Sequence, residues 1–240
     1  MKITWLLLFI SLGLYGQPSA LPLSPKRDSS HFSRKMIIPV ALMVTGIMTS
    51  NSPFEKSLHT DIRNAVGNDF DLGIDDYFQY APIAEMYLAD IWGAKSKNHW
   101  FDQTKNLLLA DLITGTLVFS IKKITAKRRP NGADLSFPSG HTTFAFANAG
   151  VLYHEFKDNH PILAYSGFAF STTTGLFRML NDKHWLSDVL FGAGLGLCIP
   201  ILIYHFEPLK NWNPFHKKVN LILQSKIKNK GYEFYLCYQF

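Results

Sequence analysis

The 240-residue chain contains little cysteine and little charge. Its two cysteines, Cys198 and Cys237, form no CxxC pair and no Cys/His cluster of metal-ligand spacing. We therefore expect neither a zinc site nor a disulfide framework, and a single bridge between the two is left open. Charged residues make up 18% and hydrophobic residues 47%, against roughly 25% charged residues in a soluble domain. This balance excludes a disordered chain and a highly charged protein that coats nucleic acid.

Long hydrophobic runs are also scarce. The apolar runs are too long for typical strands, which predicts helices, but most are at or below the ~17–25 residues that span a bilayer. A soluble all-α protein and a membrane bundle both remain open. Gly192 and Gly196 at GxxxG spacing, and aromatic residues at the ends of the runs, favour the membrane. The runs are Met36–Ser50, Tyr77–Trp92, Asn106–Ile121, Thr142–Tyr153, Ile162–Phe177 and Val189–Tyr204.

The two ends of the chain differ from this pattern. Residues 1–20 combine Lys2, an apolar stretch from Ile3 to Tyr15 and then small residues, which predicts a secretory signal peptide or an uncleaved N-terminal anchor. Without a lipobox cysteine we expect no lipoprotein anchor. Lys218–Phe240 alternates in polarity around a turn at 228–231, which predicts a small β-hairpin. The predicted fold is an all-α bundle of about five or six transmembrane helices with this hairpin at its C-terminus.

The net charge of +6, from 24 Lys and Arg against 18 Asp and Glu, suits an anionic partner. Five cations lie within Lys122–Pro130, and Pro130 is expected to stop the preceding helix and direct the chain after Arg129. A basic patch of this kind is by default a topology or headgroup signal. The five cations are Lys122, Lys123, Lys127, Arg128 and Arg129.

A second polar cluster, Phe137–His141, reads FPSGH and opens into the helix predicted from Thr142. A helix N-terminus offers unpaired backbone N–H groups and a positive dipole, and Gly140 lets an anion approach that backbone closely. Taken alone, the cluster could be a simple helix cap with Ser139 as the capping side chain. The cluster therefore offers either an anion site or a cap.

The third cluster is Arg178–Asp188. If His184 opens a helix, Asp188 follows at i+4 on the same face, so its carboxylate can hold one ring nitrogen and leave the other free. Alone, this pair would be an ordinary surface contact. The three clusters together supply cations, helix N-terminal donors and a reactive imidazole, which is the inventory that phosphoryl transfer needs.

The three clusters resemble the signature of the type-2 phosphatidic acid phosphatase superfamily, which includes class A acid phosphatases and vanadium haloperoxidases. The signature K-x6-R-P, P-S-G-H and S-R-x5-H-x3-D is matched by Lys122–Pro130, Pro138–His141 and Arg178–Asp188. The similarity covers about Asn106–Tyr204. Phe177 stands where the signature has Ser, which puts local helix packing in doubt more than activity.

The resemblance implies a role for each matching residue. His184 would attack phosphorus and form a phosphohistidine, Asp188 would orient it, and His141 would act as general acid and then base. No metal or cofactor is implied. The substrate phosphate would be bound by Lys122, Arg129, Ser139, Gly140 and Arg178.

The resemblance also implies a domain over residues 21–210 with its core at 106–204, followed by a tail over 211–240. The apolar runs favour a phosphorylated lipid of the bacterial envelope: lipid A phosphate, undecaprenyl pyrophosphate or phosphatidylglycerol phosphate. We expect an inner-membrane protein with its site facing the periplasm and no nucleic-acid partner; the oligomeric state is open. The alternatives are a soluble periplasmic acid phosphatase or haloperoxidase and a non-catalytic lipid-binding membrane protein.

The predicted topology contains one conflict. The positive-inside rule places Lys95, Lys97 and Lys105 in the cytoplasm, which puts all three motifs outside. If a signal peptide is cleaved and both Met36–Ser50 and Tyr77–Trp92 span the membrane, the motifs face inward instead. The periplasmic arrangement therefore requires that one of these runs does not span, or that the basic stretch Lys26–Lys35 stays inside.

Overall fold

The computed structural model describes residues 29–206, 220–228 and 231–239. The predicted signal peptide over 1–20 lies outside these residues. The described helices are α1 (Ser29–Thr49), α2 (Pro53–Val66), α3 (Asp75–Phe78), α4 (Ala81–Ile91), α5 (Trp100–Thr125), α6 (Gly140–Phe156), α7 (Pro161–Leu180) and α8 (Leu186–His205).

The all-helical prediction is confirmed for residues 29–206, and every predicted apolar run lies in helical structure. The run Tyr77–Trp92 is divided between α3 and α4. Helix α2 was not predicted, because its segment is polar. Ser52 starts it as the N-cap, accepting a hydrogen bond from the Glu55 N–H at 3.1 Å, and Pro53 occupies the first helical position.

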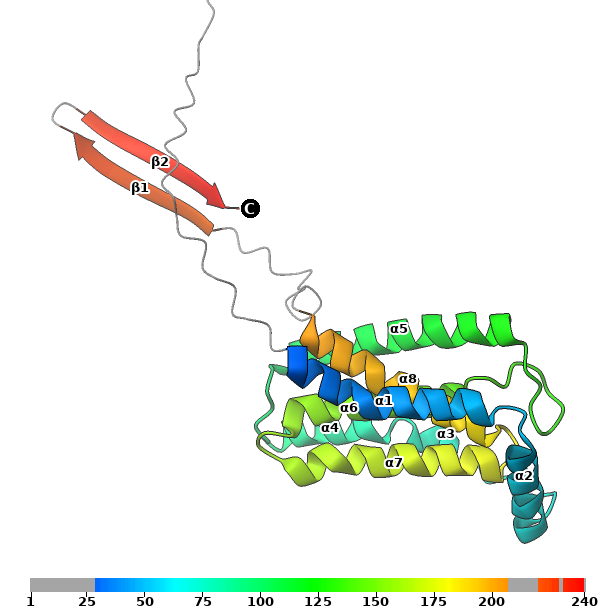
Figure 1. Cartoon of the computed structure of the whole chain (residues 1–240). Coiled ribbons are helices and arrows are strands. Elements are labelled where there is room, and N and C mark those ends of the chain that lie inside the picture. The colour runs from blue at the N-terminus through cyan, green and yellow to red at the C-terminus, as the bar shows by residue number, and fades with distance from the viewer. Residues whose placement is uncertain (1–28, 207–219, 229–230, 240) are drawn as a thin grey trace, which may run out of the picture.

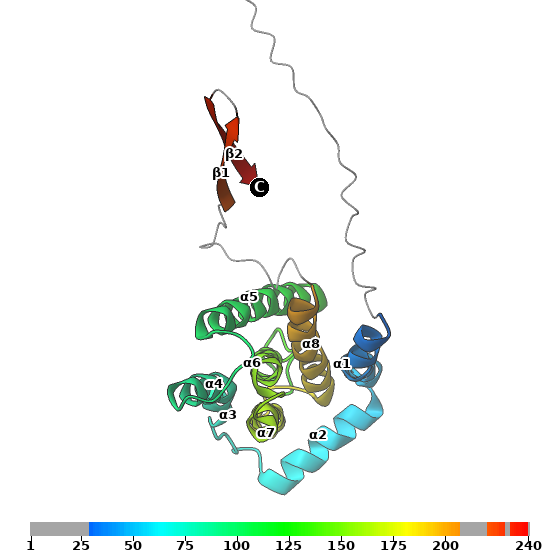
Figure 2. The same ribbon diagram turned by 90° about the vertical axis from the view of Figure 1, so that its left-hand side faces the viewer.

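The helices α1 and α4–α8 lie side by side, and α6 runs through the centre of the bundle (Figures 1 and 2). Small residues let α6 be surrounded closely, and six of its core side chains are fully buried. Helices α5 and α7 end, and α6 and α8 begin, at one end of the bundle, here called the motif end. The opposite end, where α1 begins and α6 and α8 end, is called the distal end. The buried α6 side chains are Ala145, Ala147, Ala149, Val151, Leu152 and Phe156.

The glycines of α8 let it approach its neighbours closely, as the GxxxG spacing predicted. A Cβ atom on Gly196 would lie 2.4 Å from the Thr143 carbonyl oxygen on α6, and one on Gly194 would lie 2.5 Å from the Pro39 carbonyl oxygen on α1. Any larger residue at these positions would push the helices apart. This contact brings the start of α8 beside the start of α6.

Two described helices, over Phe32–Thr49 and Leu186–His205, are long and apolar enough to cross a bilayer. The prediction of five or six spanning helices is therefore not met by this measure. Helix α4 has 11 residues, so it is about 16 Å long, well short of a hydrocarbon core of about 30 Å. Helix α5 is long enough, but polar residues such as Asp111 interrupt its apolar surface.

Towards the C-terminus the backbone forms two antiparallel strands, β1 (Asn220–Lys228) and β2 (Gly231–Gln239), with Lys228 opposite Gly231. The site lies wholly within residues 32–206. Cys198 is a buried free thiol in α8.

Candidate active site

The loop between α5 and α6 carries the first motif. Helix α5 ends at Thr125, and Ala126 takes a left-handed conformation with φ 45°. The helix therefore stops before Pro130, and the prediction that Pro130 ends it is wrong. Lys122, in the last turn, donates hydrogen bonds to the carbonyls of Leu135 and Ser136, the latter at 3.1 Å. The lysine thus ties the end of α5 to the loop that leads into α6.

His184 lies just before α8 rather than inside it. The turn that carries it passes through Asp182 at φ 58°, and the His184 N–H donates to the Arg178 carbonyl at 3.1 Å. Helix α8 begins at Leu186, so the prediction that His184 opens the helix is wrong. The contact expected from it is nevertheless present, because His184 Nδ1 lies 3.3 Å from Asp188 Oδ2.

Asp188 is fully buried and links all three motifs. Its Oδ2 accepts hydrogen bonds from the Ser136 hydroxyl and from the Trp185 N–H, the latter at 3.0 Å. Its backbone carbonyl accepts the Ser139 N–H at 3.0 Å. With the carboxylate ionised, the Nδ1 proton of His184 points at Asp188, and the lone pair of the ring is on Nε2.

The protonation state of His184 follows from its surroundings. Only 2% of the residue is exposed. Burial lowers its pKa to about 4, although the hydrogen bond and charge of Asp188 act in the opposite direction. At neutral pH the imidazole is therefore uncharged, which is the form that a nucleophile requires.

Lys127 lies between two buried carboxylates. Its Nζ is 3.1 Å from Asp188 Oδ1 and 3.5 Å from Glu55 Oε2, and it donates to the Ser187 hydroxyl at 2.7 Å. Glu55, from α2, also accepts the Ser187 N–H at 2.9 Å. Lys127 therefore holds the carboxylate that orients His184.

The remaining cations of the first motif divide into two groups. Lys123 is exposed, and the Arg128 side chain is 82% exposed and lies 3.8 Å from Asp134. These two side chains therefore lie away from the buried site, and Lys127 is held by Asp188 and Glu55. Lys122 and Arg129 are partly buried and turn towards the site.

Lys122, Arg129 and Arg178 form the positive side of the site. Burial lowers the pKa of Lys122 to about 8, and the neighbouring charges of Arg129 and Arg178 contribute in the same direction. The pKa of Arg129 is lowered by burial and then by Arg178. Among the described residues, the buried Nε atoms of both arginines have no acceptor. Three crowded cations with unused N–H donors suit an anion with several oxygens.

Two adjacent carboxylates in α3 border this positive side. Asp75 is buried and accepts hydrogen bonds from Arg178 Nη1 at 2.6 Å and from Asn181 Nδ2 at 2.8 Å. Asp76 is exposed, and its Oδ1 lies 2.9 Å from His141 Nε2 and 3.5 Å from Arg178 Nη1. Burial and the charge of Arg178 lower the pKa of His141, and Asp76 raises it.

Ser139 and Gly140 occupy the start of α6. Ser139 is buried at the N-cap position. Its hydroxyl pairs with the Thr142 hydroxyl at 2.9 Å and caps no backbone N–H, so the alternative of a simple side-chain cap is not met. Gly140 is the first residue of the helix. Its N–H belongs to the first turn, where the backbone donors have no partner within the helix.

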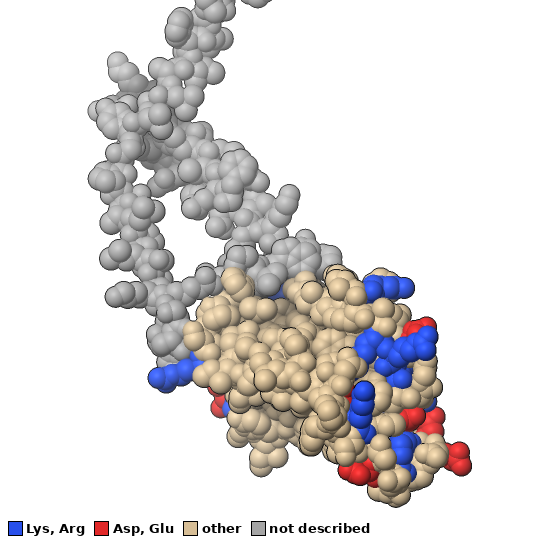
Figure 3. Space-filling view, turned by 45° about the vertical axis from the view of Figure 1, so that its right-hand side comes forward, with Lys and Arg blue, Asp and Glu red and all other residues tan. Residues whose placement is uncertain are grey.

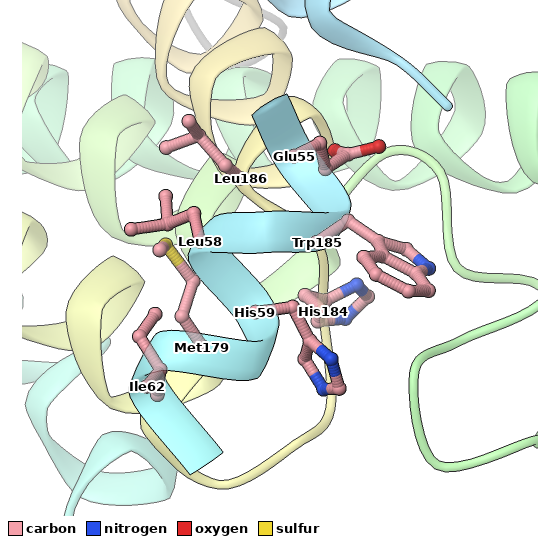
Figure 4. A pocket seen from close by; sticks show the side chains of 8 residues that line it. All are labelled: Glu55, Leu58, His59, Ile62, Met179, His184, Trp185 and Leu186. Atoms are coloured by element: carbon pink, nitrogen blue, oxygen red, sulfur yellow. The ribbon is translucent and has the colours of Figure 1, made fainter. Parts of the chain in front are cut away.

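Helix α2 covers one side of His184. A small pocket beneath it is lined by His184, Trp185, Met179 and His59 together with other residues of α2 (Figure 4). His59 Nε2 lies 2.6 Å from Asp182 Oδ1, and its ring centroid is 5.0 Å from that of Trp185. The contacts of α2 fix the turn that carries His184.

The sequence reasoning found the motif residues and missed Glu55, Asp75, Asp76 and Ser136. All but Ser136 lie in the stretch 51–76. Two local signals there could have found α2: Phe54, Leu58, Ile62 and Val66 recur every four residues, as on one face of a helix, and the Ser-x-x-Glu pattern at Ser52 is typical of a helix start. Phe177 leaves α7 continuous to Leu180, so replacing Ser at this position does not break the helix.

The site combines a neutral imidazole held by a carboxylate with three cations and a helix N-terminus, an arrangement that suits phosphoryl transfer. Residues 100–212 match the model of the PAP2 superfamily. The three motifs predicted this match, and they lie within the matched residues.

Two curated relatives share the domain. The chain is 30% identical over 151 residues to the lipid A 1-phosphatase of Porphyromonas gingivalis, an alignment that covers 62% of this chain and 34% of that protein. It is 33% identical over 81 residues to the undecaprenyl-diphosphatase BcrC of Bacillus subtilis, covering 33% of this chain and 39% of that protein. The chain thus spans well under half the length of these relatives.

The fold is similar to that of a solved structure. A transmembrane PAP2-type phosphatidylglycerolphosphate phosphatase from Bacillus subtilis superposes with a TM-score of 0.53 at 18% identity, covering 75% of this chain and 99% of that one. At this identity the likeness concerns the fold alone.

Proposed function

We propose that this protein is a phosphatase that hydrolyses a phosphate or pyrophosphate monoester of a bacterial envelope lipid through a phosphohistidine intermediate. The observation that carries the proposal is the His184–Asp188 pair, at 3.3 Å, buried beside Lys122, Arg129 and Arg178. A neutral nucleophile among unpaired cation donors matches the needs of phosphoryl transfer, where positioning and charge neutralisation supply most of the rate.

In the first step, His184 Nε2 attacks phosphorus and the bond to the leaving oxygen breaks. Asp188 stabilises the imidazolium that forms, because it accepts the Nδ1–H hydrogen bond. Lys122, Arg129, Arg178, the Ser139 hydroxyl and the Gly140 N–H bind the phosphoryl oxygens. His141 gives its proton to the leaving oxygen, so the lipid departs as an alcohol or a monophosphate.

In the second step, His141 takes a proton from a water molecule, which attacks the phosphorus of the phosphohistidine. The P–N bond breaks, inorganic phosphate leaves and His184 returns to its neutral form. Burial and Arg178 lower the pKa of His141, and Asp76 partly opposes this shift, which favours the protonated form that the first step needs.

The surface supports a lipid substrate. On the face shown in Figure 3, charged atoms gather mainly at one end and uncharged surface covers most of the remainder. Helices α1, α5 and α7 expose large apolar side chains, an arrangement that marks contact with lipid. These include Ile37, Ile47, Met48, Leu108, Leu112, Phe119, Ile162 and Leu176.

The same surface supports a location in the inner membrane. Helix α1 runs from the distal end to the motif end, and α4 runs back in the opposite direction (Figure 1). Helix α8 ends at the distal end, where α1 begins. We propose that the distal end, with Lys35, Lys97 and Lys157, faces the cytoplasm and the motif end faces the periplasm. In this arrangement Met36–Ser50 and Tyr77–Trp92 both cross or enter the membrane, and the basic stretch Lys26–Lys35 stays in the cytoplasm. The motifs then face the periplasm even though both runs are in the membrane.

Among the candidate lipids, we propose the phosphate of lipid A first and undecaprenyl pyrophosphate second. The relative with the longer alignment carries the name lipid A 1-phosphatase, and the shorter one is named an undecaprenyl-diphosphatase. Phosphatidylglycerol phosphate is the third candidate.

The test is phosphate release by the purified chain from these three lipids and from a water-soluble phosphomonoester. His184→Ala should abolish release from every substrate, and Lys123→Gln, which changes an exposed cation of the same motif, should not. A chain that fractionates as soluble and prefers the water-soluble ester would instead be an acid phosphatase. A folded, fully active His184→Ala variant would refute the mechanism.

A further inference from the structure

A second cavity lies away from the motif residues, between α1, α6, α7 and α8. It is a groove of about 450 Å³, within the roughly 300–1,000 Å³ typical of ligand pockets. Its walls are almost entirely apolar and include Leu42, Phe146, Phe168 and Leu197. The groove is thus large enough and apolar enough for a hydrocarbon chain.

A smaller polar pocket adjoins the groove at the distal end. This pocket of about 70 Å³ shares Lys35, His154 and Lys157 with the groove and adds Lys97. Three lysines from three different segments, α1, the α4–α5 loop and the end of α6, therefore converge at the mouth of one apolar cavity. Within residues 32–206, none of the three forms an ion pair.

We propose that this combined cavity binds an anionic phospholipid of the bilayer, with an acyl chain in the groove and the headgroup phosphate among Lys35, Lys97 and Lys157. Apolar walls that end in clustered cations complement a molecule with a hydrocarbon chain and an anionic head. A neutral lipid would leave the three ammonium groups without a counter-charge.

The flanking segments of the chain are poorer occupants. Residues 207–219 contain three lysines against one glutamate, and residues 21–28 contain Lys26 and Arg27 against Asp28. Both segments are net positive, so each would add to the repulsion at the mouth of the groove. Charge complementarity favours an anionic lipid over either segment.

This lipid site is separate from the catalytic site. His141 and His154 are thirteen residues apart on α6, so the two sites lie about 20 Å apart along the helix axis. The bound lipid would contact the leaflet opposite the one that supplies the substrate. The proposal concerns binding at the distal end and does not depend on the proposed phosphatase activity.

The test uses the full-length protein, purified in detergent and stripped of lipid, with equal amounts of phosphatidylglycerol and phosphatidylcholine of the same acyl chains. Retained lipid is counted by native mass spectrometry. We expect the wild type to retain phosphatidylglycerol in preference to phosphatidylcholine. The double variant Lys35→Gln/Lys157→Gln should retain about tenfold less phosphatidylglycerol, because each lysine near an anionic headgroup increases the binding affinity several-fold. The matched control Lys56→Gln/Lys95→Gln changes two exposed lysines outside the cavity and should retain the lipid normally.

Two further variants separate the parts of the site. Leu42→Trp fills the groove and should displace the lipid without a change of charge, and Lys122→Gln, at the motif end, should have no effect on retention. Glycerol phosphate, which has no acyl chain, should not compete. Equal retention of the two lipids, an equal effect of both double variants, or binding only after residues 1–28 are deleted would overturn the proposal.

Discussion

Lys127 provides a sharp test of how the site is held together. Replacing it with Met would keep the length of the side chain and leave Glu55 and Asp188 buried without their shared cation. Removing one partner of a buried ion pair costs about 3–5 kcal/mol. The lower value is expected here, because both carboxylates keep backbone donors: Ser187 N–H for Glu55 and Trp185 N–H for Asp188.

A loss of about 3 kcal/mol in a domain of this size corresponds to a fall of about 10 °C in Tm. The assay is thermal unfolding of the detergent-purified protein together with its rate of phosphate release, which should fall because Asp188 no longer orients His184 firmly. Lys123→Met, at an exposed position of the same segment, is the matched control. We expect its Tm and activity to be unchanged.

The double variant Glu55→Gln/Lys127→Met separates ion pairing from packing. It removes one of the two buried carboxylate charges that Lys127→Met leaves unpaired, so it should regain part of the lost stability. We expect a coupling free energy between the two substitutions of about 1–3 kcal/mol. If Lys127→Met had the Tm and activity of the wild type, or if the effects of the two changes simply added, the buried network would not hold the site.

Three further predictions concern the phosphate side of the site and the helix contact behind it. Because the pKa of Lys122 is lowered to about 8, this lysine loses its charge above that pH, and kcat/KM of the wild type should fall about tenfold per pH unit there. In Lys122→Arg, kcat/KM should stay constant over the same pH range. A wild-type kcat/KM that does not fall above pH 8 would contradict the assignment. Asp76 lies against His141 and Arg178, so Asp76→Asn should strengthen competitive inhibition by inorganic phosphate several-fold. Asp71→Asn, in the same segment, should leave the inhibition unchanged. Weaker inhibition of Asp76→Asn would argue against a phosphate site beside Asp76. Gly196→Leu should force α8 from α6 and lower both Tm and activity, and a variant as stable as the wild type would show that the helices tolerate separation.

The helices and most residues of the candidate site could be predicted from the sequence, because both leave local patterns. Apolar runs of helical length predict helices, and three short motifs in order predict the residues that meet at the motif end. The pairing of His184 with Asp188 was correct for a partly wrong reason. The carboxylate reaches the ring because Asp188 caps α8 and the turn at Asp182 folds His184 back towards it.

The supporting residues could not be predicted, because they act across long sequence distances. Glu55 reaches Lys127 across the bundle end, and Asp75 reaches Arg178 from a four-residue helix. The four-residue apolar spacing of α2 predicts a helix, but it does not indicate which partners the polar residues of that helix meet. The different positions of Lys127 and Arg128 could not be predicted either, because they depend on side-chain direction. The Lys127 side chain points into the buried network and the Arg128 side chain points into solvent, although the two residues are neighbours in the sequence.

The most direct measurement concerns the covalent intermediate. The purified protein would be mixed with a lipid phosphate labelled in its phosphoryl group, quenched with base within the first turnover and digested for mass spectrometry. The mechanism predicts a base-stable, acid-labile phosphoryl group on His184 that is present in the wild type and missing in His184→Ala. Substrate turnover without label on His184, or label on another residue, would contradict it.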